Sequence, residues 1–251
     1  MVWLYDSHIH LSDPAYADDI HSTLKAMSGM KIKACCVSMD TANSHQTLDL
    51  AKKSDHVLPF VGIHPECVND DLELMENMIR ENIQSISGIG EIGLDPTFVT
   101  SEDDTTRQVH VFESLLGMAE TYRKPVSIHS RKSLDQILEI MTSYTTKHAL
   151  LHWFDGGKKQ LRIAMDMGFF VSFGPVLIYA NDKQVLLSKT DPSRILVETD
   201  GPVNFSRCFE KKPAQIGFIP SVVFCASKIL DTSYEEMSSQ LEINSKAYLG
   251  I

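Results

Sequence analysis

The stretch VWLYDSHIH (residues 2–10) changes from an apolar run into a pair of histidines, and a similar change recurs along the chain. Residues 2–5 are apolar throughout, as expected for a strand that is buried on both faces. In His8-Ile9-His10 the histidines stand two residues apart, so on an extended backbone both rings project to the same side. The stretch therefore predicts a buried strand whose carboxyl end presents two candidate metal ligands.

Seven further short apolar runs follow, separated by segments whose apolar residues have helical spacing. Most runs are rich in β-branched or aromatic residues and lack polar alternation, which is typical of strands in a parallel sheet. The eight expected strands cover residues 2–5, 32–38, 57–63, 86–89, 125–128, 149–151, 169–173 and 195–197. Helices are expected over residues 16–27, 45–52, 72–79, 105–122, 134–141, 161–167, 185–187 and 222–230.

Eight strands alternating with eight helices in 251 residues predict one domain, residues 1–251, with the fold of a (β/α)8 TIM barrel or a distorted form of it. An open doubly wound sheet is the alternative. Five of the expected strands end in His, Glu or Asp, and a barrel gathers all its carboxyl ends at one face, whereas an open sheet spreads them along a line. This favours the barrel. An extra C-terminal helix over residues 234–248 is expected to pack on the barrel exterior.

The composition excludes some classes of protein and sets the expected environment. A net charge of −10 argues against a broad basic surface that coats nucleic acid, although bound divalent cations can supply positive charge locally. The five cysteines are odd in number and form no C-x-x-C pair, so we expect reduced thiols. We see no secretory signal and no apolar stretch near the roughly 20 residues of a membrane span. We therefore expect a cytoplasmic monomer with no membrane contact and no stable protein partner.

The polar residues at the strand ends are the candidate chemistry of this chain. Imidazole and carboxylate together suit borderline and hard divalent cations. Each residue also has a plainer interpretation, as a core or solvated histidine, a surface glutamate or a capping aspartate. Their shared position at strand ends favours a metal-dependent hydrolase, in which a carboxylate can bridge two cations and another can accept a proton from water. The six candidates are His8, His10, Glu91, His129, His152 and Asp200.

Three further residues are interpreted as supporting groups. His64, in Gly62-Ile63-His64-Pro65, is interpreted as a contact to substrate phosphate or the transition state; a metal ligand or a plain loop histidine is the alternative. Arg131 offers the geometry that binds an anion, and a solvated surface arginine is the alternative. Asp6 is expected to orient His8. Neither a G-x-S-x-G motif nor a phosphate-binding loop occurs.

Six blocks of sequence, spread over nearly the whole chain, resemble the TatD family of metal-dependent hydrolases, within the amidohydrolase-type barrels. The blocks are DSHIHLS (6–12), GIHP (62–65), GIGEIGLD (88–95), KPVSIHSR (124–131), LLHWFDGG (150–157) and ILVETDGP (195–202). The resemblance implies two divalent ions, Mg²⁺, Mn²⁺ or Zn²⁺, and nuclease activity on DNA that is commonly Mg²⁺-dependent. It assigns His8, His10 and Asp200 to one metal and His129 and His152 to the other, with Glu91 as the bridge and His64 near phosphate.

The chain departs from the pattern of this family at positions near the expected substrate. Glu66 stands where the family often has a second histidine, and Lys132 stands where an aspartate often follows Arg131. The segment His152-Trp153-Phe154-Asp155-Gly156 replaces the usual HCFSG, and Arg207 with Lys212-Pro213 matches an R…NEP-like segment without its asparagine. All six metal positions are kept. The metal chemistry therefore follows from the resemblance more firmly than the substrate does.

Three functions remain open at this point. The first is a phosphodiesterase, a deoxyribonuclease acting on DNA, in which Asp200 and Glu91 are the catalytic carboxylates and His64 and Arg131 bind the substrate. The second is a hydrolase of a small ester, lactone or amide, because a water activated by the metals attacks carbonyl carbon as well. The third is a non-enzymatic barrel that binds metal or a partner, which the complete set of six ligands disfavours.

Overall fold

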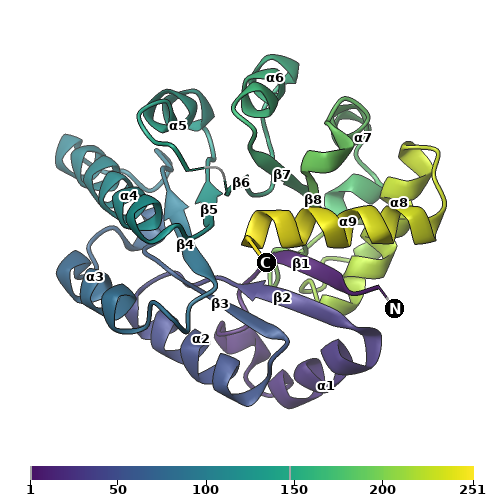
Figure 1. Cartoon of the computed structure of the whole chain (residues 1–251), viewed down its shortest axis with the longest axis horizontal. Helices are drawn as coiled ribbons and strands as arrows, with labels where there is room; N and C mark the ends of the chain where they lie inside the picture. The colour runs from purple at the N-terminus through teal and green to yellow at the C-terminus, as the bar shows by residue number, and fades with distance from the viewer. Residues whose placement is uncertain (1, 147) are drawn as a thin grey trace.

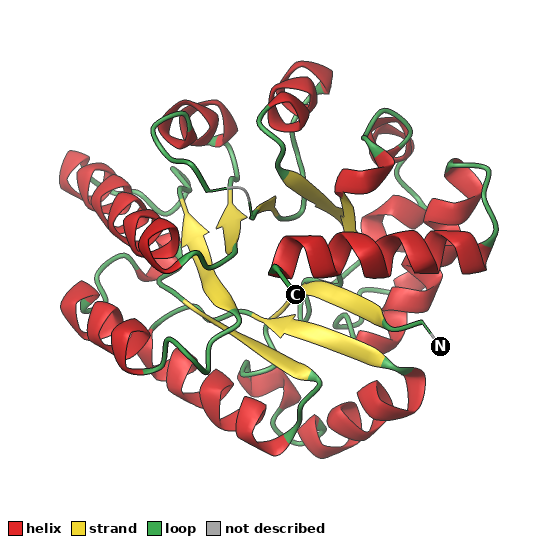
Figure 2. Cartoon of the chain, viewed as in Figure 1, coloured by secondary structure: helices red, strands yellow, loops and turns green. Residues whose placement is uncertain are grey.

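The computed structural model, which describes residues 2–146 and 148–251, contains one eight-stranded parallel sheet in the order β1 to β8. Figure 2 shows these strands in yellow, with the helices in red. Each strand pairs with the next along the chain. The strands are β1 (Leu4–Ile9), β2 (Ile32–Cys36), β3 (Val57–Val61), β4 (Gly88–Gly93), β5 (Val126–His129), β6 (Ala149–Leu151), β7 (Phe170–Phe173) and β8 (Ile195–Val197).

The helices form an outer layer around these strands (Figure 1). Strands and helices alternate along the chain and form a nearly closed barrel, so the expected (β/α)8 TIM barrel with an extra C-terminal helix is confirmed. The helices are α1 (Ile20–Met30), α2 (Thr41–Lys53), α3 (Leu72–Glu81), α4 (Glu102–Tyr122), α5 (Leu134–Met141), α6 (Lys158–Asp166), α7 (Asn181–Leu187), α8 (Ile219–Ile229) and α9 (Tyr234–Leu249).

Hydrogen bonds between β1 and the chain around the end of β8 bring the first and last strands together. The Ser7 hydroxyl donates to the carbonyl of Val197 at 2.9 Å, and the backbone N–H of Asp200 donates to the carbonyl of His8 at 2.9 Å. These bonds place His8 and Asp200 side by side although they are far apart in sequence. Barrel closure thus joins the first and last candidate ligands.

Several expected strands differ in their limits from the observed ones, and two of these differences move candidate ligands into strands. The first runs over Leu4–Ile9 and not residues 2–5, and the fourth runs over Gly88–Gly93 and not residues 86–89. His8 and Glu91 therefore lie within strands, where hydrogen bonds and neighbouring histidines compensate their burial. The register of each strand is irregular at this point, between Asp6 and Ile9 and between Ile89 and Ile92. Such irregularities redirect side chains near functional sites.

The last helix was expected on the barrel exterior, but its final turn reaches an inner cluster of the barrel. The Tyr248 ring on α9 stacks on Phe60 of β3, with centroids 6.1 Å apart, and meets the edge of Phe170 of β7 at 5.7 Å. Tyr248 is only 1% exposed, and α9 packs against β1 and β8. The sequence pattern predicts this helix, but it does not identify the cluster that Tyr248 enters.

Within the described residues, no single helix is long and apolar enough to cross a membrane. The segments Ile216–Ile229 and Tyr234–Leu249 pass such a test only when taken together, and the chain bends by 109° between them.

Gly93 allows the backbone of β4 to approach β5 at the floor of the site. Its φ is +151°, and a Cβ atom at this position would lie 2.0 Å from the carbonyl oxygen of His129. Gly93→Ala is expected to lower the free energy of unfolding by about 2 kcal/mol or more, because strained backbone alone costs roughly 1–3 kcal/mol. Urea unfolding followed by circular dichroism measures this change.

Gly117→Ala is the matched control, because Gly117 lies within helix α4 and a Cβ atom there would meet nothing within 4 Å. It is expected to raise the free energy of unfolding by about 0.5–1 kcal/mol, since alanine favours the helix more than glycine does. Equal losses in the two variants would contradict the close approach at Gly93.

Candidate metal centre

The carboxylate of Glu91, in β4, faces imidazole nitrogens with both of its oxygens. Oε1 lies 2.8 Å from His129 Nδ1 and 2.8 Å from His152 Nε2. Oε2 lies 3.3 Å from His8 Nε2 and 3.4 Å from His10 Nε2. Burial alone would raise the pKa of Glu91, but the surrounding histidines hold it well below its ordinary value. One buried carboxylate thus stands between two pairs of nitrogen donors.

Asp200 adds a second carboxylate beside one of these pairs. Its Oδ1 lies 3.6 Å from His8 Nε2 and 3.6 Å from His10 Nε2. Asp200 follows β8 in a left-handed conformation, with φ +51°, and its backbone N–H is held by His8. The structure therefore brings all six candidate ligands together, from β1, β4 and β5 and from the residues that follow β1, β6 and β8.

The hydrogen bonds of His129 indicate that a positive charge fits between its Nδ1 atom and the carboxylate of Glu91. Its Nε2 lies 2.9 Å from Asp95 Oδ2 and donates to that carboxylate, so the neutral ring has its lone pair on Nδ1. That lone pair faces Glu91 Oε1 at 2.8 Å, which places two acceptors against each other. Either a second ring proton or a bound cation resolves this contact. Imidazole nitrogen with carboxylate oxygen is a donor set suited to divalent metals.

The same crowding occurs among the other rings. His8 Nε2 lies 3.3 Å from His10 Nε2, and His152 Nε2 lies 3.4 Å from His129 Nδ1. Burial lowers the pKa of His8 to about 4, so a second ring proton is unfavourable there. Ligand atoms of His8, His10 and Glu91 lie within 4.8 Å of one another, as do those of His64, Glu91 and His129. The residues of this centre therefore fit a bound cation.

Asp95 was missed in the sequence. It lies two residues after the end of β4 and is fully buried. Its carboxylate accepts hydrogen bonds from the N–H and hydroxyl of Thr97 and from Nε2 of the His129 ring. Burial would raise the pKa of Asp95, but the hydrogen bonds from His129 and Thr97 lower it to about 2. Its place four residues after Glu91, past a strand end, is the signal that could have identified it.

Asp6 does not orient the His8 ring as expected. Its carboxylate accepts the backbone N–H of His8 at 3.2 Å and binds Thr199 through that residue's N–H and hydroxyl. The ring nitrogen Nδ1 of His8 instead lies 2.8 Å from the hydroxyl of Ser127, on β5. Burial raises the pKa of Asp6 to about 8, as expected for a carboxyl that links β1 to the residues after β8 inside the barrel.

Comparison with known proteins identifies the family of this chain. A family model described as TatD related DNase matches residues 5–250. The chain belongs to the TatD family. Within it, the chain is 23% identical to an uncharacterized metal-dependent hydrolase, YabD, of Bacillus subtilis, over 97% of both chains. It is 27% identical to the human deoxyribonuclease TATDN3, over 80% of this chain and 78% of that one.

The crystal structure of YjjV, a TatD homologue from Escherichia coli K12, superposes with a TM-score of 0.90. It covers 99% of this chain and 98% of the homologue at 21% identity, which shows the shared fold. The protein is thus a metal-dependent hydrolase of the TatD family.

In this TatD-family barrel, His64 lies beside the metal centre with its proton facing inward. Its Nδ1 accepts the backbone N–H of Glu66 at 3.1 Å, and burial lowers the pKa of His64 to about 3, so the ring is neutral with its proton on Nε2. That nitrogen lies 3.3 Å from His129 Nδ1 and 3.6 Å from Glu91 Oε1. A protonated Nε2 is a donor, which favours contact with an anion over metal ligation. The side chain of Glu66 is exposed, and its backbone N–H contacts the ring.

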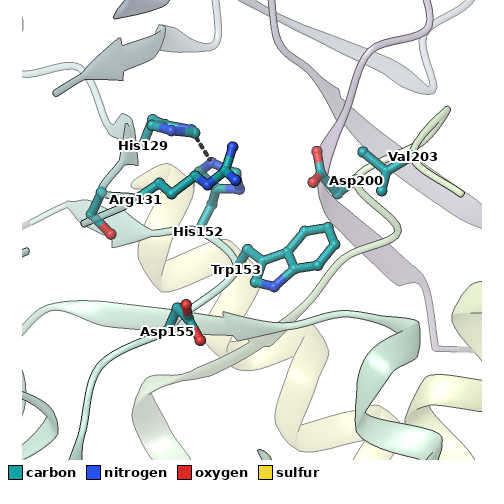
Figure 3. Close-up of a pocket in the computed structure, with 8 residues that line it drawn as sticks. His129, Arg131, His152, Trp153, Asp155, Asp200 and Val203 are labelled. Atoms are coloured by element: carbon teal, nitrogen blue, oxygen red, sulfur yellow. Dashed lines mark hydrogen bonds between the residues drawn. The ribbon is translucent and has the colours of Figure 1, made fainter. Parts of the chain in front are cut away.

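A cavity of about 410 Å³ opens over the TatD centre (Figure 3). The exposed Arg131 lines it, and the neighbouring Lys132 is exposed in a left-handed turn. Asp155 also lines it and is paired with Lys183 of α7. The full lining is His129, Ser130, Arg131, His152, Trp153, Asp155, Asp200 and Val203.

Proposed function

We propose that this TatD-family hydrolase cleaves phosphodiester bonds of DNA with two divalent cations. The observation that carries the proposal is the buried Glu91 carboxylate, whose two oxygens face separate pairs of histidines. His8, His10 and Asp200 would hold one cation and His129 and His152 the other, with Glu91 between them. When bound, two cations in such a site stabilise both the attacking and the leaving oxygen and lower the pKa of water.

The remaining groups orient the substrate and move a proton. Asp200 lies at the edge of the centre and lines the cavity, so its carboxylate can accept the proton of the attacking water. His64 directs an Nε2 proton toward the centre, where it can donate to a phosphate oxygen. The Arg131 guanidinium supplies a positive charge at the mouth of the cavity, where it can bind the phosphate from the solvent side.

Deoxyribonuclease assays test this proposal. Protein freed of metal by chelation is dialysed, reloaded separately with Mg²⁺, Mn²⁺ or Zn²⁺, and incubated with end-labelled single- and double-stranded DNA. We expect cleavage that requires added metal and stops with excess chelator. Intact DNA under all three metals would contradict the proposal.

A second candidate function is hydrolysis of a small ester, lactone or amide. The cavity volume of about 410 Å³ favours it, because that size is typical of small-molecule pockets. A panel of lactones and carboxylic esters, assayed with the same metal-loaded preparations, separates this activity from cleavage of DNA. Turnover of the panel with intact DNA would support the second candidate.

Asp95 is proposed to fix the His129 ring so that Nδ1 faces the metal. Asp95→Ala is expected to weaken metal binding by about 10- to 100-fold, the usual effect of removing such an outer partner. Competition with a chromophoric chelator measures the affinity. Thr97→Val is the control, because it removes a hydroxyl that donates to Asp95 but keeps the contact with His129. Similar losses in both variants would show that the loop, and not the His129 contact, controls binding.

A further inference from the structure

We propose that Trp153 forms a stacking subsite for a nucleobase of the substrate and that Glu198 is the positioning residue for this subsite. The inference rests on the proposed function, because cleavage of DNA is the reason for expecting a nucleobase as the planar group that stacks on Trp153. It concerns a residue that the metal chemistry does not use. Trp153 follows His152 directly, and it lines the same cavity as Arg131 and Asp200 (Figure 3).

The backbone of Trp153 is held in an unusual conformation. Its φ is +40°, a left-handed value that a bulky residue adopts only when its surroundings impose it. The Trp153 N–H donates to Glu198 Oε1 at 2.8 Å and lies 3.1 Å from the hydroxyl of Ser172. That hydroxyl donates in turn to the other oxygen of Glu198. The fully buried Glu198 thus fixes the turn that carries the indole.

A second aromatic ring also packs against the indole. Phe205 stacks on Trp153 with ring centroids 5.3 Å apart and an interplanar angle of 21°. Phe205 is only 2% exposed, so it is a fixed part of the loop that follows β8. A ring held both by its backbone and by a stacked neighbour loses little freedom when it binds a ligand.

The groups around this cavity match the chemistry of a nucleotide. The aromatic wall of Trp153 suits a planar base, and Arg131 and the metal centre suit the attached phosphate. Stacking on an aromatic side chain tolerates any base, because every base has a π face. The subsite therefore selects a phosphodiester that carries a base over one that carries only sugar.

Tryptophan fluorescence tests the subsite directly, since the chain has two tryptophans. Trp3 precedes β1 and lies against His56 and Lys33, away from the centre. In a Trp3→Phe background, loaded with Mg²⁺, Trp153 is the only tryptophan. We expect saturable quenching by dAMP and none by deoxyribose 5-phosphate, with dAMP binding about tenfold more tightly. Equal affinity for the two compounds, without quenching, would overturn the proposal.

Kinetics supply the second test. We expect Trp153→Leu to raise KM about tenfold for a dinucleotide, with little change for the same compound lacking its base, and Trp153→Phe to raise it less. The preference for the base is the ratio of these two KM values. Glu198→Ala is expected to reduce this preference, and Glu198→Gln, which keeps an acceptor oxygen, is expected to retain it. An unchanged preference in Trp153→Leu overturns the subsite.

The two tests separate this inference from the proposed function. Quenching by dAMP in a protein that leaves DNA intact would support the subsite and reject the deoxyribonuclease. Cleavage of DNA with no preference for a base would reject the subsite alone.

Discussion

Glu91→Gln is expected to lower kcat/KM for DNA by about 10³-fold or more. The substitution replaces one carboxylate oxygen by an amide NH₂ group, which cannot ligate a cation. Because each oxygen of Glu91 faces its own pair of histidines, at least one of the two proposed metal positions loses a ligand. Metal ions stabilise the charge of the transition state by several kcal/mol in such reactions. Losing this stabilisation lowers kcat/KM by about 10³-fold.

Initial rates at saturating Mn²⁺, with the metal content measured on the same samples, check this expectation. Glu81→Gln is the matched control, because Glu81 is exposed at the end of α3 and the same change of charge there leaves the centre intact. A Glu91→Gln enzyme that keeps both its metal content and its rate within tenfold of the parent would contradict the role of the carboxylate.

Asp200→Asn is expected to act mainly on kcat, with a loss of about 10²- to 10⁴-fold, the range typical of a lost general base. Asp200 lies farther from the histidines than Glu91 does, at 3.6 Å, so metal content should fall less than in Glu91→Gln. Asparagine keeps the shape of the side chain but cannot accept the proton of the attacking water. Single-turnover rates separate the chemical step from substrate binding.

Asp18→Asn is the matched control for this substitution, because Asp18 is exposed and precedes α1, remote from the cavity lining. It is expected to keep the parent kcat. If Asp200→Asn raised KM and left kcat unchanged, Asp200 would be a binding residue and not a base.

The barrel could be predicted from the sequence because eight apolar runs alternate with helical segments and five of them end in ligand-type residues. The limits of β1 and β4 could not be predicted, since the polar residues inside these strands have the sequence pattern of loop residues. Only the hydrogen bonds and close contacts of Asp6, His8 and Glu91 within the barrel make their burial favourable. The insertion of Tyr248 likewise depends on a space that the whole barrel creates.

The candidate ligands could be named from their positions at strand ends, and the structure places them around one carboxylate, although their metal binding stays a prediction. The contacts of the outer partners could not be predicted, because they depend on turns that sequence periodicity does not describe. Asp95 meets His129 from the loop after β4, and Glu198 meets the backbone of Trp153 and not its side chain. Asp6, by contrast, was assigned to the wrong partner.

If Glu91 separates two cations, a crystal of the metal-loaded protein contains two metal ions beside this carboxylate. Crystals of the protein soaked in Mn²⁺ are measured at the manganese absorption edge, and the anomalous difference map is calculated. We expect two peaks, one at Oε1 with His129 and His152 and one at Oε2 with His8, His10 and Asp200. A single peak, or peaks that do not contact Glu91, would rule out the bridging role of this carboxylate.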